Sequence, residues 1–119
     1  MSDFHAFVEE LLAGLGPIAI KRMFGAAGVY ANGVMFALID EDVLYLKADD
    51  ALKAAMTAEG SVAWTYSRAA HTREMGYWRL PEAALDDPDE AVRWARAALA
   101  VAHAKQAAKP KGRRARARQ

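Results

Sequence analysis

The chain opens with apolar residues at the spacing of a helix. They recur at i, i+3, i+4, i+7, i+8 and i+11, which places them on one stripe of a helix: Phe4, Phe7, Val8, Leu11, Leu12 and Leu15. Gly14, Gly16 and Pro17 follow, and such residues commonly end helices. The pattern predicts an N-terminal helix whose whole stripe faces a core.

Strand-like runs replace the helical period from Ile18 onward. Gly25 and Gly28 interrupt the first run, which we interpret as one strand with a bulge or tight bend. Asn32-Gly33 then predicts a hairpin turn, because both central positions of a type I′ turn need positive φ. In the resulting register Ala31 faces Val34, Tyr30 faces Met35 and Val29 faces Phe36.

The acidic turn at residues 40–42 leads into a third strand at residues 43–47, so residues 18–47 are predicted to form a three-stranded antiparallel meander. A second helix begins at Asp49 or Asp50, carries Leu52, Ala55 and Met56, and ends at Gly60. Two more strands are predicted around residues 62–66 and 73–80, the latter stopped by Pro81.

The last helix has the clearest start signal in the chain. Asp87 occupies the N-cap position, Pro88 follows at the first helical position, and Glu90 completes an aspartate version of the capping box. Its predicted buried face consists of Val92, Ala95, Ala98, Leu99 and Ala102. The element order α-β-β-β-α-β-β-α predicts an α+β two-layer sandwich, with helices on one face of a five-stranded, mainly antiparallel sheet.

Charge divides the chain into two parts. Residues 1–104 hold 9 basic and 15 acidic residues, for a net −6, and we predict that they form one domain. Residues 105–119 contain no acid, and their +7 comes from Lys105, Lys109, Lys111, Arg113, Arg114, Arg116 and Arg118. Because this segment lacks apolar periodicity and contains Pro110 and Gly112, it is predicted to be a disordered basic tail.

The tail has two interpretations. Its cations can contact phosphates and give unspecific nucleic-acid affinity, which the −6 of the body opposes. Alternatively, the tail only keeps the protein in solution. The sequence leaves both open.

The sequence contains no residue pattern typical of a catalytic site or a metal site. The chain has no cysteine, which excludes disulfides and thiolate sites. His5, His71 and His103 do not lie four residues apart or beside a patterned carboxylate, so we predict no enzyme activity, no metal site and no cofactor. No apolar run approaches the roughly 18 residues that span a bilayer, and we expect a cytoplasmic protein without a membrane partner.

Two weaker patterns concern nucleic acid. Gly25-Ala26-Ala27-Gly28 has the spacing of a nucleotide-clamping Gly-x-x-Gly loop, although strands flank it and a structural bend explains it better. Lys21 and Arg22 precede it. Tyr30, Tyr45 and Tyr66 would form an aromatic platform if they shared an open face, and packing is the competing interpretation.

Short motifs spread over residues 4–104 resemble the N-terminal domain of the TfoX/Sxy proteins, regulators of natural DNA competence in bacteria. The segments that carry the resemblance include Arg22–Gly25, Gly28–Tyr30, Gly33–Ala37, Leu44–Lys47 and Tyr77–Glu82. We take the following residues as a mainly structural family signature: Arg22, Met23, Phe24, Gly25, Gly28, Tyr30, Gly33, Phe36, Tyr45, Lys47, Tyr66 and Pro81. Ala26 stands where the family pattern leads us to expect glycine.

The resemblance implies a stand-alone domain without the second, helical domain of full-length competence regulators. Those regulators are transcriptional co-activators that work with the cyclic-AMP receptor protein. We therefore expect a non-enzymatic regulatory or adaptor domain that contacts a protein of the transcription machinery, with auxiliary nucleic-acid affinity from the tail. The alternative is a homodimeric module that binds a peptide or small molecule through an open sheet face or strand edge and has no role in competence.

Overall fold

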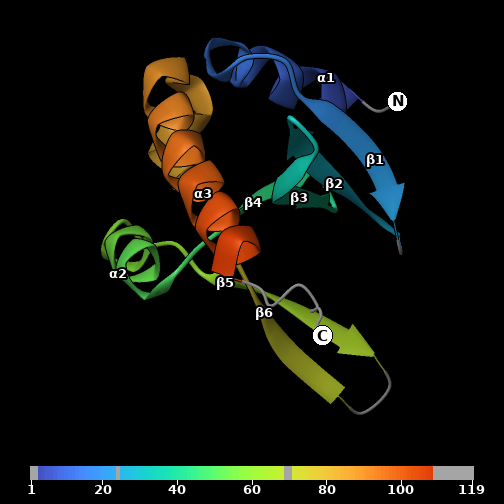
Figure 1. Ribbon diagram of the computed structural model, residues 1–119, viewed down its shortest axis with the longest axis vertical. Coiled ribbons are helices and arrows are strands. Elements are labelled where there is room, and N and C mark those ends of the chain that lie inside the picture. The colour runs from blue at the N-terminus through green and yellow to red at the C-terminus, as the bar shows by residue number, and fades with distance from the viewer. Residues whose placement is uncertain (1–2, 24, 69–70, 109–119) are drawn as a thin grey trace, which may run out of the picture.

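A computed structural model of the chain describes residues 3–23, 25–68 and 71–108 (Figure 1). The helices are α1 (Asp3–Leu11), α2 (Asp50–Ala58) and α3 (Pro88–Ala108), with short 3-10 helices at Ala13–Leu15 (η1) and Glu82–Asp86 (η2). The strands are β1 (Ala19–Met23), β2 (Ala26–Ala31), β3 (Val34–Asp40), β4 (Val43–Lys47), β5 (Ala63–Arg68) and β6 (His71–Arg79).

The strands form one six-stranded antiparallel sheet in the order β1-β2-β3-β4-β6-β5. The α+β class is confirmed, with one strand more than predicted. The extra strand arises because the first run does not bend but folds back as a β1–β2 hairpin, in which Met23 pairs with Ala26 and Gly25 has φ +81°. Such a positive φ favours glycine. Ala26 lies within β2, where any residue fits.

The β2–β3 hairpin turns at Asn32 and Gly33, whose φ values are +53° and +79°, as the type I′ signal predicts. Two predicted pairs are confirmed, but Val29 faces Ala37 and not Phe36, because the register shifts after Val29. A register shift of this kind turns neighbouring residues toward the same side. It allows Phe36 and Ala37, both 0% exposed, to lie in one core cluster.

Helix α1 buries a narrower stripe than predicted. Val8, Leu11 and Leu12 are at most 4% exposed, whereas Phe7 is 38% exposed and its ring contacts Phe4 at a centroid distance of 5.8 Å. At 3.6 residues per turn Phe7 lies at the margin of the stripe. The prediction that Phe7 faces the core was wrong.

Helix α2 begins as predicted, since the Asp49 side chain accepts a hydrogen bond from the Leu52 N–H at 2.9 Å. Leu52 and Met56 are buried, while Ala55 is exposed.

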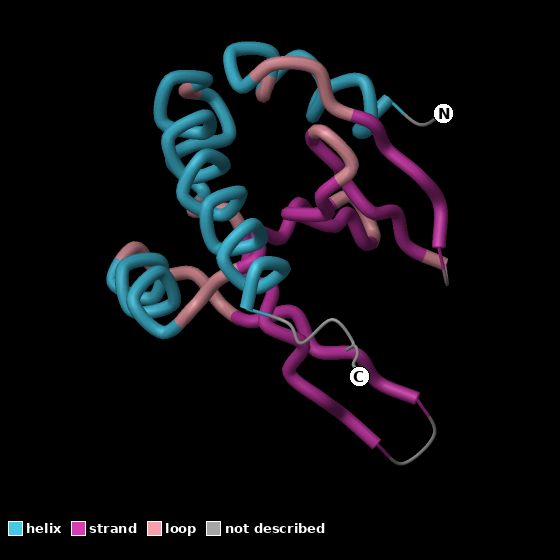
Figure 2. The backbone as a smooth tube through the Cα atoms, in the orientation of Figure 1, coloured by secondary structure: helices cyan, strands magenta, loops and turns pink. Residues whose placement is uncertain are grey.

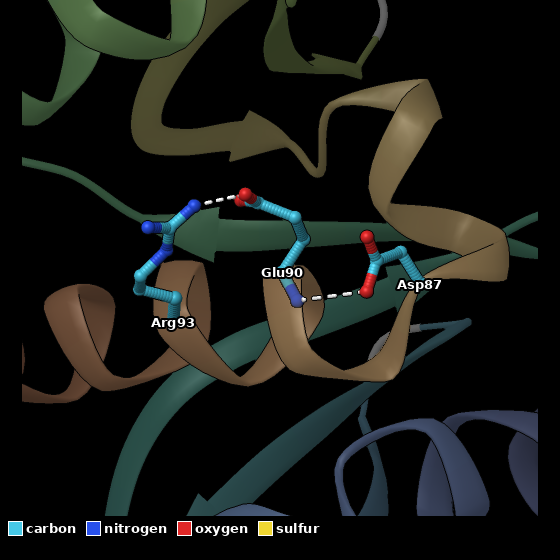
Figure 3. A network of polar contacts seen from close by, with 3 residues as sticks. All are labelled: Asp87, Glu90 and Arg93. Carbon is cyan, nitrogen blue, oxygen red and sulfur yellow. Dashed lines mark hydrogen bonds and ion pairs between the residues drawn. The ribbon is translucent and has the colours of Figure 1, made fainter.

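The start of α3 confirms half of the capping box (Figure 3). Asp87 Oδ1 accepts a hydrogen bond from the Glu90 N–H at 3.3 Å. The Glu90 carboxylate turns away from Asp87 and pairs with Arg93 one turn later. The Asp87 N–H instead donates to the carbonyl of Ala84 at 3.2 Å, because η2 leads directly into the helix and supplies that acceptor.

Helix α3 packs against β3 and β4 through small residues. Its buried positions follow one stripe: Ala91, Ala95, Ala98, Val101 and Ala102. Val92 and Leu99, predicted as buried, are only partly so. Val92 points toward Gly14, where an added Cβ would meet its Cγ2 at 3.3 Å. The helix therefore divides its apolar surface between the sheet and the segment that follows α1.

Helix α3 also continues to Ala108, past the predicted domain boundary at residue 104. The remainder of the predicted tail, residues 109–119, lies outside the described residues. Among the helices that the structure describes, none has both the length and the hydropathy that crossing a membrane would require.

The arrangement leaves the two sheet faces unequal. Figures 1 and 2 show α2 and α3 on the same side of the strands, with the β5–β6 hairpin projecting away from the helices. Val8 and Leu12 of the α1 segment join the same core cluster as the α3 alanines and Leu44 and Leu46 of β4.

Two phenylalanine substitutions test this division between core and surface. Phe36→Ala removes a side chain that is 0% exposed and should lower the free energy of unfolding by about 3–5 kcal/mol. Phe7→Ala, the matched control at 38% exposure, should cost less than about 1.5 kcal/mol. Urea unfolding followed by circular dichroism measures both, and equal losses would contradict the assignment of Phe7 to the surface.

Candidate functional site

One face of the sheet carries a cluster of aromatic and methionine side chains that we call the open face. Leu44 and Leu46 of β4 lie in the core cluster with α3, so the alternate residues Tyr45 and Lys47 project to the opposite face. Strand pairing extends this face, because residues directly opposite each other project to the same side. Along it lie Lys21, Met23, Gly28, Tyr30, Met35, Leu38, Asp40, Tyr45, Lys47, Tyr77 and Arg79.

Leu38 shows how well this face is covered. It is 3% exposed, yet it does not belong to the core cluster beneath α3. Its cross-strand neighbours are Gly28 and Tyr45. Side chains of the open face therefore shield Leu38 themselves.

Three rings form the first part of the open face. Trp64 of β5 lies 6.3 Å from Tyr45 and 6.4 Å from Tyr77 between ring centroids, the second contact being edge-to-face. The indole Nε1–H of Trp64 donates to Asp40 Oδ2 at 2.9 Å. That hydrogen bond orients the indole and engages the carboxylate nearest to the rings. All three rings are only partly buried.

The second part of the open face is built around Gly28. A Cβ added there would meet Tyr30 Cε1 at 3.0 Å, Met23 Sδ at 3.2 Å and Met35 Cε at 3.2 Å. The ring of Tyr30 and two thioethers therefore close over a position that only glycine leaves empty. The second glycine of the Gly-x-x-Gly motif has a packing role, and the first lies in the β1–β2 turn.

Basic side chains accompany the rings. Lys21 Nζ lies 5.2 Å from the centroid of the Tyr30 ring, and Lys47 Nζ lies 4.7 Å from that of Tyr77. Both distances are within the range of cation–π attraction. Arg79 is exposed and stands opposite Tyr45 across the β4–β6 pair.

The pKa values of two phenols on this face are raised above the ordinary value of tyrosine. Burial raises the pKa of Tyr45, an effect that Asp40 and Glu41 reinforce and Arg79 opposes. Burial, together with the nearby Tyr30, also raises the pKa of Tyr77.

The predicted signature residues fall into three groups. Met23, Gly28, Tyr30, Tyr45 and Lys47 come together on the open face. Gly25 and Gly33 occupy turns, Phe36 lies in the core, and Pro81 is buried two residues after the end of β6. Arg22 is exposed on β1, Tyr66 pairs with Arg73 in the β5–β6 ladder, and Phe24 lies outside the described residues.

The other predicted candidates are not gathered into a site. His5, His71 and His103 belong to α1, β6 and α3 respectively. Among the described residues, no group of three His, Cys, Asp or Glu side chains could hold a metal ion. Lys105 is exposed near the end of α3, and the tail cations from Lys109 to Arg118 lie outside the described residues.

Sequence reasoning grouped Tyr30 with Tyr45 but missed Trp64, Tyr77 and Arg79. The alternation of Leu44, Tyr45 and Leu46 identifies the outward positions of β4. No comparable signal existed for β6, because Gly76 has φ +81° and interrupts the regular alternation. Only the pairing of β6 with β4 and β5 brings these side chains to the open face.

Comparison with known protein families finds a match that covers most of the chain. The sequence model of the family described as TfoX N-terminal domain matches residues 10–102 of the 119-residue chain. That match includes every strand and both glycines of the β1–β2 segment. No curated protein matches the chain.

The packing role of Gly28 can be tested by a double-mutant cycle. Gly28→Ala should lower the free energy of unfolding by about 1–3 kcal/mol through crowding. Tyr30→Ala removes the nearest ring. The double variant should therefore lose less stability than the sum of the two single losses, by on the order of 1 kcal/mol. Urea unfolding of the four proteins measures this coupling.

Gly60→Ala is the matched control for this cycle. Gly60 has φ +88° and nothing within 4 Å of an added Cβ, so the substitution strains only the backbone. It should not couple to Tyr30→Ala. Additive effects of Gly28→Ala and Tyr30→Ala would disprove the packing role.

Proposed function

The chain belongs to the TfoX N-terminal domain family, and on this premise we propose that it is a regulatory adaptor domain that works by binding and not by catalysis. The family is linked to the regulation of competence. Within that setting, the partner we propose is a protein of the transcription machinery, such as RNA polymerase acting with the cyclic-AMP receptor protein.

The observation that carries this proposal is the free edge of β1. This strand ends the sheet order and pairs only with β2 within the described residues. Ala19, Lys21 and Arg22 are exposed along it. An edge strand offers unpaired N–H and C=O groups, which can accept an extended segment of another protein as a further strand.

The same edge supports the second candidate, a homodimer. Two copies of an antiparallel edge can pair about a two-fold axis, because each copy then presents the same surface to the other. In that case the partner is a second copy of the chain, and the β1 edge is already paired and cannot accept a strand of another protein. Light scattering separates the two candidates, since a dimer would have twice the 13.0 kDa mass of the chain.

The basic tail adds a separate, unspecific affinity for nucleic acid in this proposal. Its cations are attached to a body of net charge −6, so they are the part of the chain best suited to contact phosphate. Contacts of this kind depend on charge alone and would help an adaptor to stay near a promoter.

Removing residues 109–119 tests the contribution of the tail. The segment contains six basic residues, and loss of six phosphate contacts should reduce the slope of log K against log salt by about 5 for duplex DNA. Fluorescence anisotropy at several salt concentrations, for the full chain and for residues 1–108, gives both slopes. Equal affinities and slopes would show that the tail serves solubility only.

Hydrogen exchange tests the protein contact. When RNA polymerase and the cyclic-AMP receptor protein are added to the full chain, amide exchange in Ala19–Met23 should slow at least tenfold as the edge becomes paired. Strand β3, which is hydrogen-bonded on both sides, is the internal control and should not change. Binding without added protection in β1 would rule out the edge, and a dimer mass before addition would favour the homodimer.

A further inference from the structure

We propose that the open face of the sheet binds single-stranded nucleic acid, with bases stacked on its aromatic rings and phosphates held by Lys21, Lys47 and Arg79. This site lies on the face of the sheet, shares only Lys21 with the β1 edge, and does not include the basic tail. The proposal goes beyond the adaptor function and does not depend on which protein occupies the edge.

The first argument is the pairing of rings with cations. Lys21 lies 5.2 Å from the Tyr30 ring and Lys47 lies 4.7 Å from the Tyr77 ring. Proteins that bind single strands combine aromatic faces for the bases with basic groups for the backbone. Each nucleotide of a single strand carries a phosphate, which a cation can bind, and a base, which can stack on an aromatic ring. The open face offers a cation beside a ring at two places, Lys21 with Tyr30 and Lys47 with Tyr77.

The second argument is the local charge. Among the described strand side chains of the open face, Lys21, Lys47 and Arg79 are basic and Asp40 is acidic. These described side chains sum to +2, whereas residues 1–104 as a whole total −6. Asp40 is also engaged by the Trp64 indole at 2.9 Å. An anionic strand is therefore attracted to this face and repelled by the rest of the domain.

The charges also define a path across the sheet. Glu41 and Asp42 lie in the turn between β3 and β4, at the end of the face where Asp40 stands. A polyanion should avoid that end. The favourable path runs from Lys21 and Tyr30 on the β1–β2 side to Lys47 and Tyr77 on the β4–β6 side.

The third argument is shape and accessibility. The rings of Tyr30, Tyr45, Trp64 and Tyr77 are partly exposed, so a base can reach them. The rings lie on four different strands, β2, β4, β5 and β6, and a flexible strand can follow them across the sheet more readily than a stiff duplex. A duplex, moreover, keeps its base faces stacked internally. The site should consequently prefer single strands.

Fluorescence anisotropy of the full chain with labelled twelve-residue oligothymidylate tests the proposal, with a duplex of the same length for comparison. Tyr30→Leu and Tyr77→Leu each remove one stacking ring and should weaken single-strand binding about fivefold to a hundredfold. Duplex binding, which depends on the tail, should change less than twofold. Because the tail is present in all variants, it cannot account for a difference between them.

Tyr30→Phe and Tyr77→Phe are the matched controls, since they keep the ring and remove only the hydroxyl. They should bind the oligonucleotide within twofold of the unchanged chain. Lys47→Ala should reduce the slope of log K against log salt for the single strand by about 0.7. Leucine variants that bind the oligonucleotide as tightly as the phenylalanine variants would overturn the proposal.

Photo-crosslinking with 5-iodouracil oligonucleotides keeps the test valid if a leucine variant fails to fold, because it uses the unchanged chain. Crosslinks should map by mass spectrometry to peptides containing Tyr30 in β2 and Tyr77 in β6. Crosslinks confined to the tail would overturn the proposal. So would a dimer that buries the open face and excludes the oligonucleotide, or binding of an apolar peptide there without any nucleic-acid competition.

Discussion

The structure depends on one constraint: β3 must be buried on both faces although the described helices cover only one. Beneath α3, the alanine stripe lets the helix approach Phe36 and Ile39 closely enough to exclude water. On the other face no helix shields Leu38, which is nonetheless 3% exposed. Aromatic and methionine side chains of neighbouring strands supply that cover, and this requirement accounts for the composition of the open face.

Covering Leu38 with side chains of the open face also shapes the surface that this face presents. Rings that shield Leu38 from one side remain partly exposed on the other, so the same side chains serve packing and present a surface. Gly28 is central to the arrangement, because its missing Cβ lets Tyr30 and two methionines close over the strand. A surface of rings, thioethers and basic groups is suited to binding. Membership of a regulatory family agrees with this conclusion.

Charge separates the surfaces of the molecule in the same way. The acidic residues of the body lie mainly in helices and turns. Several of them lie at the starts of α2 and α3, where their negative charge interacts favourably with the helix dipole. The open face instead carries Lys21, Lys47 and Arg79. A net charge of +1 for the whole chain hides this distribution.

Local signals in the sequence were sufficient for the fold class and for most of the elements. Asn32-Gly33 and the caps Asp49 and Asp87 each depend on residues close in the chain, and each was found in place. The β1–β2 hairpin, the shifted partner of Val29 and the exposure of Phe7 were not predicted. Each of these three features depends on how strands and helices from other parts of the chain pack against the segment.

By itself, then, the sequence determined the starts of α2 and α3, the Asn32-Gly33 turn, the α+β class, the family and the separation of charge between body and tail. Only the tertiary structure decided which aromatic residues act together. Trp64, Tyr77 and Tyr45 come from different strands, and β6 pairs with β4 only after the chain has passed through α2 and β5. The physical reason is that residue spacing records local geometry, whereas a surface shared by distant strands arises from their pairing.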